Sequence, residues 1–286
     1  MLNPPLSLLS DDLLDYIVEQ VAKLTLPDEY LKYLSLADRA FTQSCQKYIF
    51  RELKLGDRKK IYKRLKKVKK ILDDKPLFVN RVRMINLDLL WEENISVFKN
   101  PNFISIFQLF AKSPIPPHEL HLRRIFSRII IEDPLLIMRQ FAKSFFPKTL
   151  TILHLEEIFV VPLHVFLICP RLREVSLDRV GATGKGYDPY PDKCCSEREA
   201  PVLEVFEYRN SHILVEQMIT SPSRFDTPVV LWSNLRVLTL APGDKEGMAH
   251  LQPILDAACI TLEELYLTKI YMGECRCGVF DIMKQI

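Results

Sequence analysis

Leu150-Thr-Ile-Leu153-His-Leu155 follows the pattern Leu-x-x-Leu-x-Leu, and this pattern recurs along the second half of the chain. Four further copies begin at residues 172, 203, 235 and 262, so that successive copies are 22, 31, 32 and 27 residues apart. Weaker copies occupy residues 82–87 and 126–131. Within each copy apolar and polar residues alternate with a period of two, which predicts a half-buried β-strand.

Strand units that recur every 20–30 residues or so are typical of leucine-rich repeats, in which one strand alternates with one return element. Apolar segments at residues 101–111, 135–146 and 252–259 fit return helices between the strands. We therefore predict an α/β fold whose body, residues 79–286, is an irregular leucine-rich-repeat solenoid of parallel strands and return helices. An ordinary α/β layer fold with a parallel sheet is the alternative. Residues 273–286 contain no polar capping repeat, which predicts an open or truncated solenoid edge.

The first 52 residues differ from the body, because they contain three short amphipathic helical segments. Ser10 precedes two aspartates and an apolar series on one helical face, so it can cap the first helix. Pro27 starts the second segment, and the third runs from about Asp38 to Ile49. About fifty residues are too few to bury a good core alone. This head is therefore expected either to dock on a partner or to cap the body.

Parts of the head resemble an F-box. The resemblance lies in residues 8–18, in residues 34–41, and in Phe50 with the exit into a first strand at residues 51–55. The similarity is greatest to the large F-box-like families of basidiomycete fungi. It implies that residues 1–52 form a three-helix domain that binds the Skp-type adaptor, and through it the cullin, of a cullin–RING ubiquitin ligase.

The resemblance also assigns the contacts with the adaptor. Carried over position by position, the adaptor-binding residues are apolar side chains of the first two helices: Leu9, Leu13, Ile17, Leu34, Leu36 and Ala37. Phe41 would pack behind them. The family usually has a proline before the first acidic position, where this chain has Ser10 and Asp11. This departure keeps open an alternative in which the head is degenerate and does not dock.

A target would bind on the concave face of the solenoid, which the strands line. Because the leucines of each strand point inward, the residues between them point outward. The predicted target-binding residues are outward positions of four strands: His154, Glu156, Glu174, Asp178, Glu207, Arg209, Glu264 and Tyr266. This set is mostly acidic, so a basic target segment would be complementary. The alternative is a solvated sheet face with no partner.

Charge is distributed unevenly along the chain. The net charge is only +3, but residues 51–83 hold 14 Lys or Arg against 4 Asp or Glu, a balance of +10, which leaves −7 for the rest. Apolar residues recur on one helical face from Ile61 to Leu72, so we predict a basic linker helix over residues 53–78. Residues 58–70 could alternatively serve as a nuclear import signal. Nucleic-acid binding is not expected, because Tyr62 is the one aromatic residue of this run and the body is acidic.

The sequence also bears on the compartment. The chain begins without the basic segment of a signal peptide, and its longest apolar stretch, residues 158–169, is interrupted by Pro162 and His164. We therefore expect an intracellular protein, in the cytoplasm or the nucleus or both, with no membrane association.

Metal and cofactor binding are not expected from the sequence. Cys45, Cys169 and Cys259 lie in apolar or helical patterns and are predicted to be buried free thiols. The pairs at residues 194–195 and 275–277 lack the Cys-x2-4-Cys spacing of zinc sites. His118 and His121 flank a glutamate, but no third ligand follows at a sensible spacing.

The chain contains no zinc-protease, nucleophile-elbow or dinucleotide-loop motif, so it is not expected to be an enzyme. The predicted function is substrate recognition in a cullin–RING (SCF-type) ubiquitin ligase, in which the head docks on the adaptor and the solenoid holds an unknown target. Such a subunit contributes proximity and orientation. The alternative is a leucine-rich-repeat interaction module with a degenerate, non-docking F-box. A third possibility is a basic-helix protein that acts at chromatin.

Overall fold

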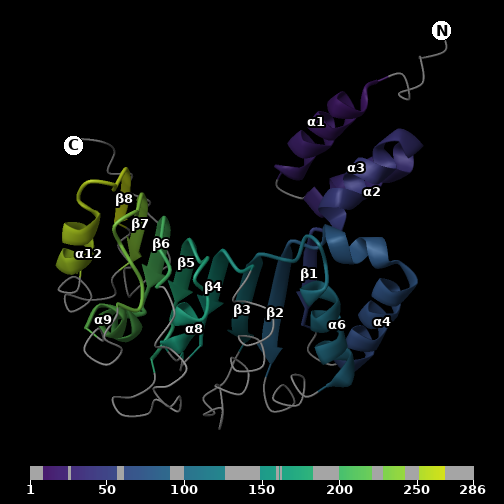
Figure 1. The fold of residues 1–286 in the computed structure, drawn as a ribbon. Helices are drawn as coiled ribbons and strands as arrows, with labels where there is room; N and C mark the ends of the chain where they lie inside the picture. Colours follow the sequence, from purple (N-terminus) through teal and green to yellow (C-terminus); the bar gives the residue numbers. More distant parts are fainter. Residues whose placement is uncertain are drawn as a thin grey trace, which may run out of the picture.

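The computed structural model describes residues 9–24, 27–56, 61–90, 100–125, 149–158, 161, 163–182, 200–220, 228–241 and 251–267. These residues form an N-terminal helical head followed by a parallel β-sheet that is covered by helices, an α/β arrangement. The sheet is curved, and the head lies next to its first strand at one end (Figure 1). Among the described helices, none is both long enough and apolar enough to cross a lipid bilayer.

Three helices make up the head, as predicted: α1 (Asp11–Ala22), α2 (Pro27–Ala37) and α3 (Arg39–Ile49). Ser10 caps α1, because its Oγ accepts a 3.4 Å hydrogen bond from the Leu13 N–H. Asp38 caps α3 by accepting a 2.8 Å bond from the Ala40 N–H. The head has a small core of its own, with residues from all three helices: Leu14, Val18, Leu31, Phe41 and Cys45.

The sheet contains eight parallel strands, and their order in space is their order in the sequence. The strands are β1 (Glu52–Leu55), β2 (Met84–Leu90), β3 (Glu119–Ile125), β4 (Ile152–Glu156), β5 (Glu174–Asp178), β6 (Val205–Arg209), β7 (Val237–Ala241) and β8 (Glu264–Leu267). The five strong copies of the Leu-x-x-Leu-x-Leu pattern provide β4 to β8. Equivalent positions pair across neighbouring strands, for example Leu153 with Val175 and Val175 with Phe206. A sequential parallel order is compatible with the predicted solenoid.

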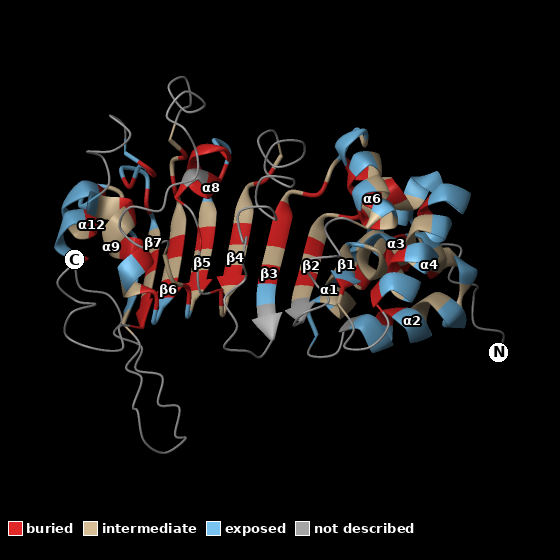
Figure 2. Ribbon diagram, turned by 90° about the horizontal axis from the view of Figure 1, so that it is seen from below, coloured by how far each residue is buried: buried red, intermediate tan, exposed pale blue. Residues whose placement is uncertain are grey.

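Helices cover one face of this sheet, along the outside of its curve (Figure 1). They are α4 (Ile61–Asp74), the 3-10 helix η2 (Pro76–Arg81), α6 (Pro101–Ala111), α8 (His164–Leu167), α9 (His212–Thr220) and α12 (Leu251–Ala258). Their apolar sides and the inward residues of the strands form one continuous core (Figure 2). The return helices expected at residues 101–111 and 252–259 correspond to α6 and α12, whereas residues 135–146 lie outside the described residues.

The third strand differs from the prediction. The weak repeat copy at residues 126–131 lies outside the described residues, and the strand between β2 and β4 is β3, where Leu120 pairs with Ile85 and Leu153. The pattern search missed β3 because Pro117 occupies the place of the first leucine of the copy. The last two apolar positions of the pattern, Leu120 and Leu122, are present and were the available signal for this strand.

Residues 53–78 were expected to be a basic linker, but the structure places them in the body. β1 pairs in parallel with β2, and Leu65 and Leu72 of α4 are buried in the core of the sheet. The predicted helix is confirmed as α4. Its apolar face packs against the sheet and α6, so α4 belongs to the body and is not a solvated linker. The body therefore begins at β1, close to residue 52.

The cysteine predictions are confirmed in two places and wrong in one. Cys45 and Cys169 are buried free thiols, whereas Cys259 is exposed at the end of α12. Cys259 directly follows Ala258, which is fully buried, so one step around the helix end turns the thiol toward solvent. The other four cysteines lie outside the described residues.

Candidate binding surfaces of the head and the sheet

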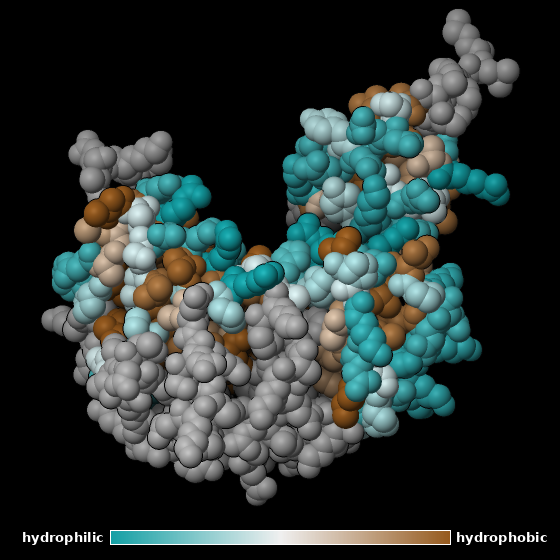
Figure 3. Space-filling model, in the orientation of Figure 1, coloured by the Kyte–Doolittle hydropathy of each residue, from teal (hydrophilic) through white to brown (hydrophobic). Residues whose placement is uncertain are grey.

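Some of the predicted adaptor-binding residues lie on the surface of the head. Leu13 of α1 is 43% exposed, Leu36 of α2 is 83% exposed, and Ala37 is exposed beside it. Leu14 and Val18 form the buried face of α1, so Leu13 belongs to a second apolar face that the head itself does not cover. Figure 3 shows an apolar patch on the part of the head that lies farthest from the sheet.

The other predicted adaptor contacts are half-buried. Leu9, Ile17 and Leu34 pack against the core of the head, and Phe41 is buried in that core as expected. The structure therefore divides the predicted set into exposed and supporting side chains. Leu13, Leu36 and Ala37 are available to a partner, and the other three hold the helices together.

The head also exposes tyrosines that the sequence reading did not single out. Tyr16 of α1 and Tyr30 and Tyr33 of α2 are all exposed. Tyr16 follows Leu13 by three residues, and Tyr30 and Tyr33 have the same spacing, so each pair shares one helix face. This spacing was the available signal. Exposed tyrosines are common in interfaces, because the ring is apolar and the hydroxyl stays hydrated.

The head is held against the body by contacts from α3. Arg81 at the end of η2 donates a 2.7 Å hydrogen bond to the Gln46 side chain. The ring of Phe50, just after α3, stacks on Phe78 with 4.2 Å between centroids, and the Arg81 guanidinium lies over the Phe78 ring. These contacts give the head a defined orientation relative to the sheet.

The predicted target-binding residues lie in register on the face of the sheet that the helices leave open. His154 pairs with Ser176, which pairs with Glu207. The remaining predicted residues follow the same alternation in neighbouring rows: Glu156, Glu174, Asp178, Arg209, Glu264 and Tyr266. Because the helices cover the outside of the curve, this face lines the inside (Figure 1). The predicted alternation of buried and outward residues is therefore confirmed for β4, β5 and β6. In β8 it is wrong, because the inward position Leu265 is exposed like Glu264 and Tyr266.

The electrostatics of this face vary from row to row. Arg179, just after β5, lies 2.8 Å from Glu157 and within 3.6 Å of carboxylate oxygens of Glu156 and Asp178, and Arg123 lies 3.5 Å from Glu156. At the carboxyl ends of the strands two guanidinium groups therefore face three carboxylates, whose charge is partly neutralised. The rows farther from these ends keep their carboxylates. Burial raises the pKa of Glu174, and repulsion from Glu119 and Glu207 adds to this effect.

A cluster of two imidazoles and a carboxylate lies on the same face. The Nε2 of His121 on β3 lies 2.7 Å from Glu119 Oε1, and the Nε2 of His154 on β4 lies 4.0 Å from the same oxygen. The pKa of His154 is lowered to about 4, first by burial and second by the positive charge of His121, while the negative charge of Glu119 acts in the opposite direction. Burial is the largest single influence on Glu119 and would raise its pKa. The hydrogen bond with His121 and the positive charges of His121, His154 and Arg51 together outweigh burial, so the pKa is lowered.

The sequence paired His121 with His118 and offered no third ligand, whereas the structure groups His121 with Glu119 and His154. The partner of His121 is His154, on the next strand, and His118 does not belong to the cluster. Thirty-three residues separate the two histidines in the chain. His154, at the middle outward position of a strong repeat copy, was the one sign of this cluster in the sequence. Placing it beside His121 requires knowing how β3 pairs with β4.

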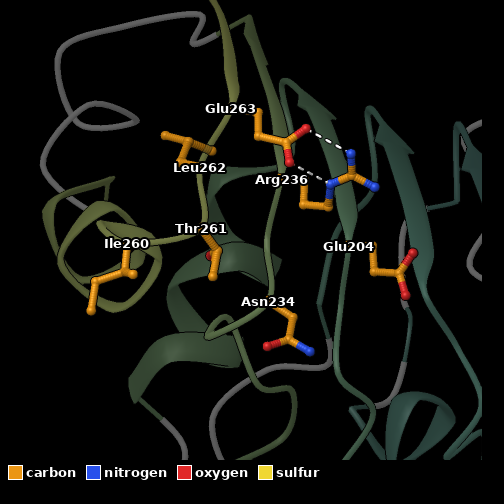
Figure 4. Close-up of a pocket in the computed structure, with 7 residues that line it drawn as sticks. All are labelled: Glu204, Asn234, Arg236, Ile260, Thr261, Leu262 and Glu263. Atoms are coloured by element: carbon orange, nitrogen blue, oxygen red, sulfur yellow. Dashed lines mark hydrogen bonds and ion pairs between the residues drawn. The ribbon is translucent and has the colours of Figure 1, made fainter. Parts of the chain in front are cut away.

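A pocket of about 470 Å³ lies near the β8 edge of the sheet (Figure 4). Its lining includes Arg236 and Glu263, which form a two-bond ion pair with distances of 2.9 and 2.7 Å. These residues immediately precede β7 and β8, and Arg173 and Glu204 pair at 2.8 Å at the same position of the preceding strands. Both pairs are exposed, so they contribute little to stability. The pocket is open and its charges are already paired.

The sequence of this chain matches no protein-family model and no curated protein.

Proposed function

We propose that this protein is the substrate-recognition subunit of a cullin–RING (SCF-type) ubiquitin ligase, with an F-box head that docks on a Skp-type adaptor and a leucine-rich-repeat body that binds the target. The observation that carries the proposal is the exposure of Leu13 and Leu36 on a three-helix head that has its own core. Both positions are ones that the F-box resemblance assigns to the adaptor. The sequential parallel sheet supports the repeat part of the proposal.

Elementary energetics favour a partner on this surface. Full burial of one leucine side chain is worth about 1.5–3 kcal/mol, and Leu36 is almost entirely in water in the free chain. Interfaces obtain most of their energy from a few large apolar or aromatic anchors. Leu13, Leu36 and the exposed tyrosines of α1 and α2 supply side chains of this type.

The target would bind inside the curve of the sheet. There the outward carboxylates, among them Glu174 and Glu207, favour a basic segment. The stacking of Phe50 on Phe78 and the bond between Arg81 and Gln46 would keep the target in a fixed orientation relative to the adaptor. In this proposal the chemistry belongs to other subunits, and the chain works inside the cell, in the cytoplasm or the nucleus.

The test is co-expression of the full chain with a Skp-type adaptor, followed by size exclusion and titration calorimetry. Leu13→Asp combined with Leu36→Asp should weaken the complex at least about a hundred-fold, because each anchor is expected to contribute about 2 kcal/mol. Ile260→Asp is the matched control, since Ile260 is 94% exposed and precedes β8, at the other end of the sheet from β1 and the head. The control should bind like the unaltered chain.

Equal thermal melting of all three proteins would show that the substitutions leave the head folded, as expected for exposed positions. A well-folded chain that forms no complex with the adaptor would refute the ligase proposal. The function would then be the alternative, an interaction module whose head has Ser10 and Asp11 in place of the family's proline and does not dock.

A further inference from the structure

The cluster on β3 and β4 has the geometry of a three-ligand metal site. Glu119 and His121 are two residues apart on one strand, so both side chains point to the same face. His154 lies directly opposite His121 in the parallel register. One ligand atom from each residue can be chosen so that all three atoms lie within 4.8 Å of one another. The three side chains therefore form a triangle on the inner face of the sheet.

The backbone beneath this triangle is firmly held. Leu120, Leu122, Leu153 and Leu155 alternate with the cluster residues, and all four are buried in the core. β3 and β4 are interior strands, paired on both sides. Ligands carried by such strands keep their relative positions, and this preorganisation favours binding.

The donor set points to a divalent transition metal. Two imidazole nitrogens with one carboxylate oxygen suit zinc and its neighbours, whereas calcium and magnesium prefer oxygen ligands alone. Glu119 is only 9% exposed, and Glu174 approaches the cluster with an oxygen 3.9 Å from His154 Nε2. Among the described residues, no lysine or arginine forms an ion pair with Glu119 or Glu174. A dication would neutralise these two carboxylates.

We propose that Glu119, His121 and His154 bind one divalent transition-metal ion on the inner face of the sheet through Glu119 Oε1 and the Nε2 atoms of both histidines. With metal–ligand distances of about 2.0–2.1 Å, tetrahedral ligands lie roughly 3.4 Å apart. The two distances of 4.0 and 2.7 Å to Glu119 Oε1 bracket this value, so small side-chain rotations suffice. Each imidazole then carries its proton on Nδ1.

All three ligands approach the metal from the sheet, so the remaining coordination positions face the open side. Water would fill them in the free protein, and Glu174 is the nearest further carboxylate. A histidine of the basic target proposed above would be able to replace that water. The site would then make recognition at this face dependent on the metal.

The test uses the full-length chain, freed of metal with a chelator and titrated with Zn²⁺ by calorimetry. The double variant His121→Gln/His154→Gln should bind one equivalent less than the unaltered chain. Loss of a second-shell partner alone typically weakens metal affinity 10–100-fold, so each single variant should lose at least that much. His118→Gln is the matched control, because His118 is close in sequence but outside the cluster.

Two further measurements distinguish the loss of the metal site from a loss of folding. Co²⁺ bound in this site should give the visible absorption of a nitrogen-ligated ion, and Zn²⁺ should raise the melting temperature of the unaltered chain but not that of Glu119→Gln. Glu119→Gln keeps the size of the side chain and a polar contact with His121, so it should fold. An unchanged number of Zn²⁺ equivalents in the double variant, or an equal loss in His118→Gln, would overturn the proposal.

Discussion

Leu65→Ala should destabilise the first part of the body by about 3 kcal/mol. Leu65 lies on α4 and is 0% exposed, within the same core as Leu55 and Leu72. The substitution removes three carbon atoms, worth about 2.4 kcal/mol of transfer free energy. A cavity term adds to this, because neighbouring strands and helices cannot collapse fully onto the gap. If α4 were a solvated linker, the same substitution would have almost no effect.

Urea unfolding with hydrogen exchange of the β1 and α4 amides is the assay that separates these cases. Lys66→Ala is the matched control on the next, exposed position of the same helix, and it should change stability by less than about 0.5 kcal/mol. The midpoint should fall for Leu65→Ala with an unchanged slope. Equal midpoints for the two variants would refute the packing of α4 against the sheet.

Three further predictions test other parts of the fold. Hydrogen bonds from Lys47 and Ser44 of α3 hold the pKa of Asp15 below 3.8, so the contribution of Asp15 to head stability is present above about pH 3.8 and is lost as the pH falls through the folded-state pKa. In hydrogen exchange of the head amides, the difference between Asp15→Asn and the unaltered chain should therefore shrink as the pH is lowered below 3.8. Ser211→Ala should lower the free energy of unfolding by about 1–3 kcal/mol in urea, because the buried Ser211 Oγ accepts a 2.9 Å bond from the Val180 N–H, which would lose its partner. Gly56→Ala should cost about 1–3 kcal/mol and lower the melting temperature, because the added Cβ would lie 2.5 Å from the Cβ of Asp88; an unchanged melt would contradict this close approach.

The strands of the second half of the molecule were predictable because the information is local. In β4 to β7, two apolar positions separated by one polar residue identify both the strand and its buried face, and the structure has Leu153 and Leu155 buried as this rule requires. The helix α6 was equally clear, since Asn100 caps it, Pro101 starts it and phenylalanines recur on one face. Each of these signals lies within about ten residues of sequence.

What could not be predicted depends on contacts between distant segments. The helical period of α4 was visible, but nothing in residues 61–74 states which surface its apolar face covers. Pro117 occupies the first leucine position of the β3 copy, so the pattern did not identify β3. Without β3 the pairing that places His121 beside His154 could not be predicted. The cluster is thus a product of pairing between strands whose sequences are 33 residues apart.

The fold places the basic and the acidic residues of the chain on opposite sides of the sheet. The exposed lysines of α4, among them Lys63, Lys66 and Lys67, lie on the helical side of the sheet, whereas Glu174 and Glu207 lie on the inner face. An α-helix with its side chains is about 10–12 Å across, which exceeds the Debye length of about 8 Å at physiological salt. The positive charge outside α4 and the negative charge on the inner face therefore do not cancel in solution. A basic target would therefore be drawn to the inner face and repelled by the outer one. The association rate of such a target should fall as salt is added, while an uncharged target would show no such dependence.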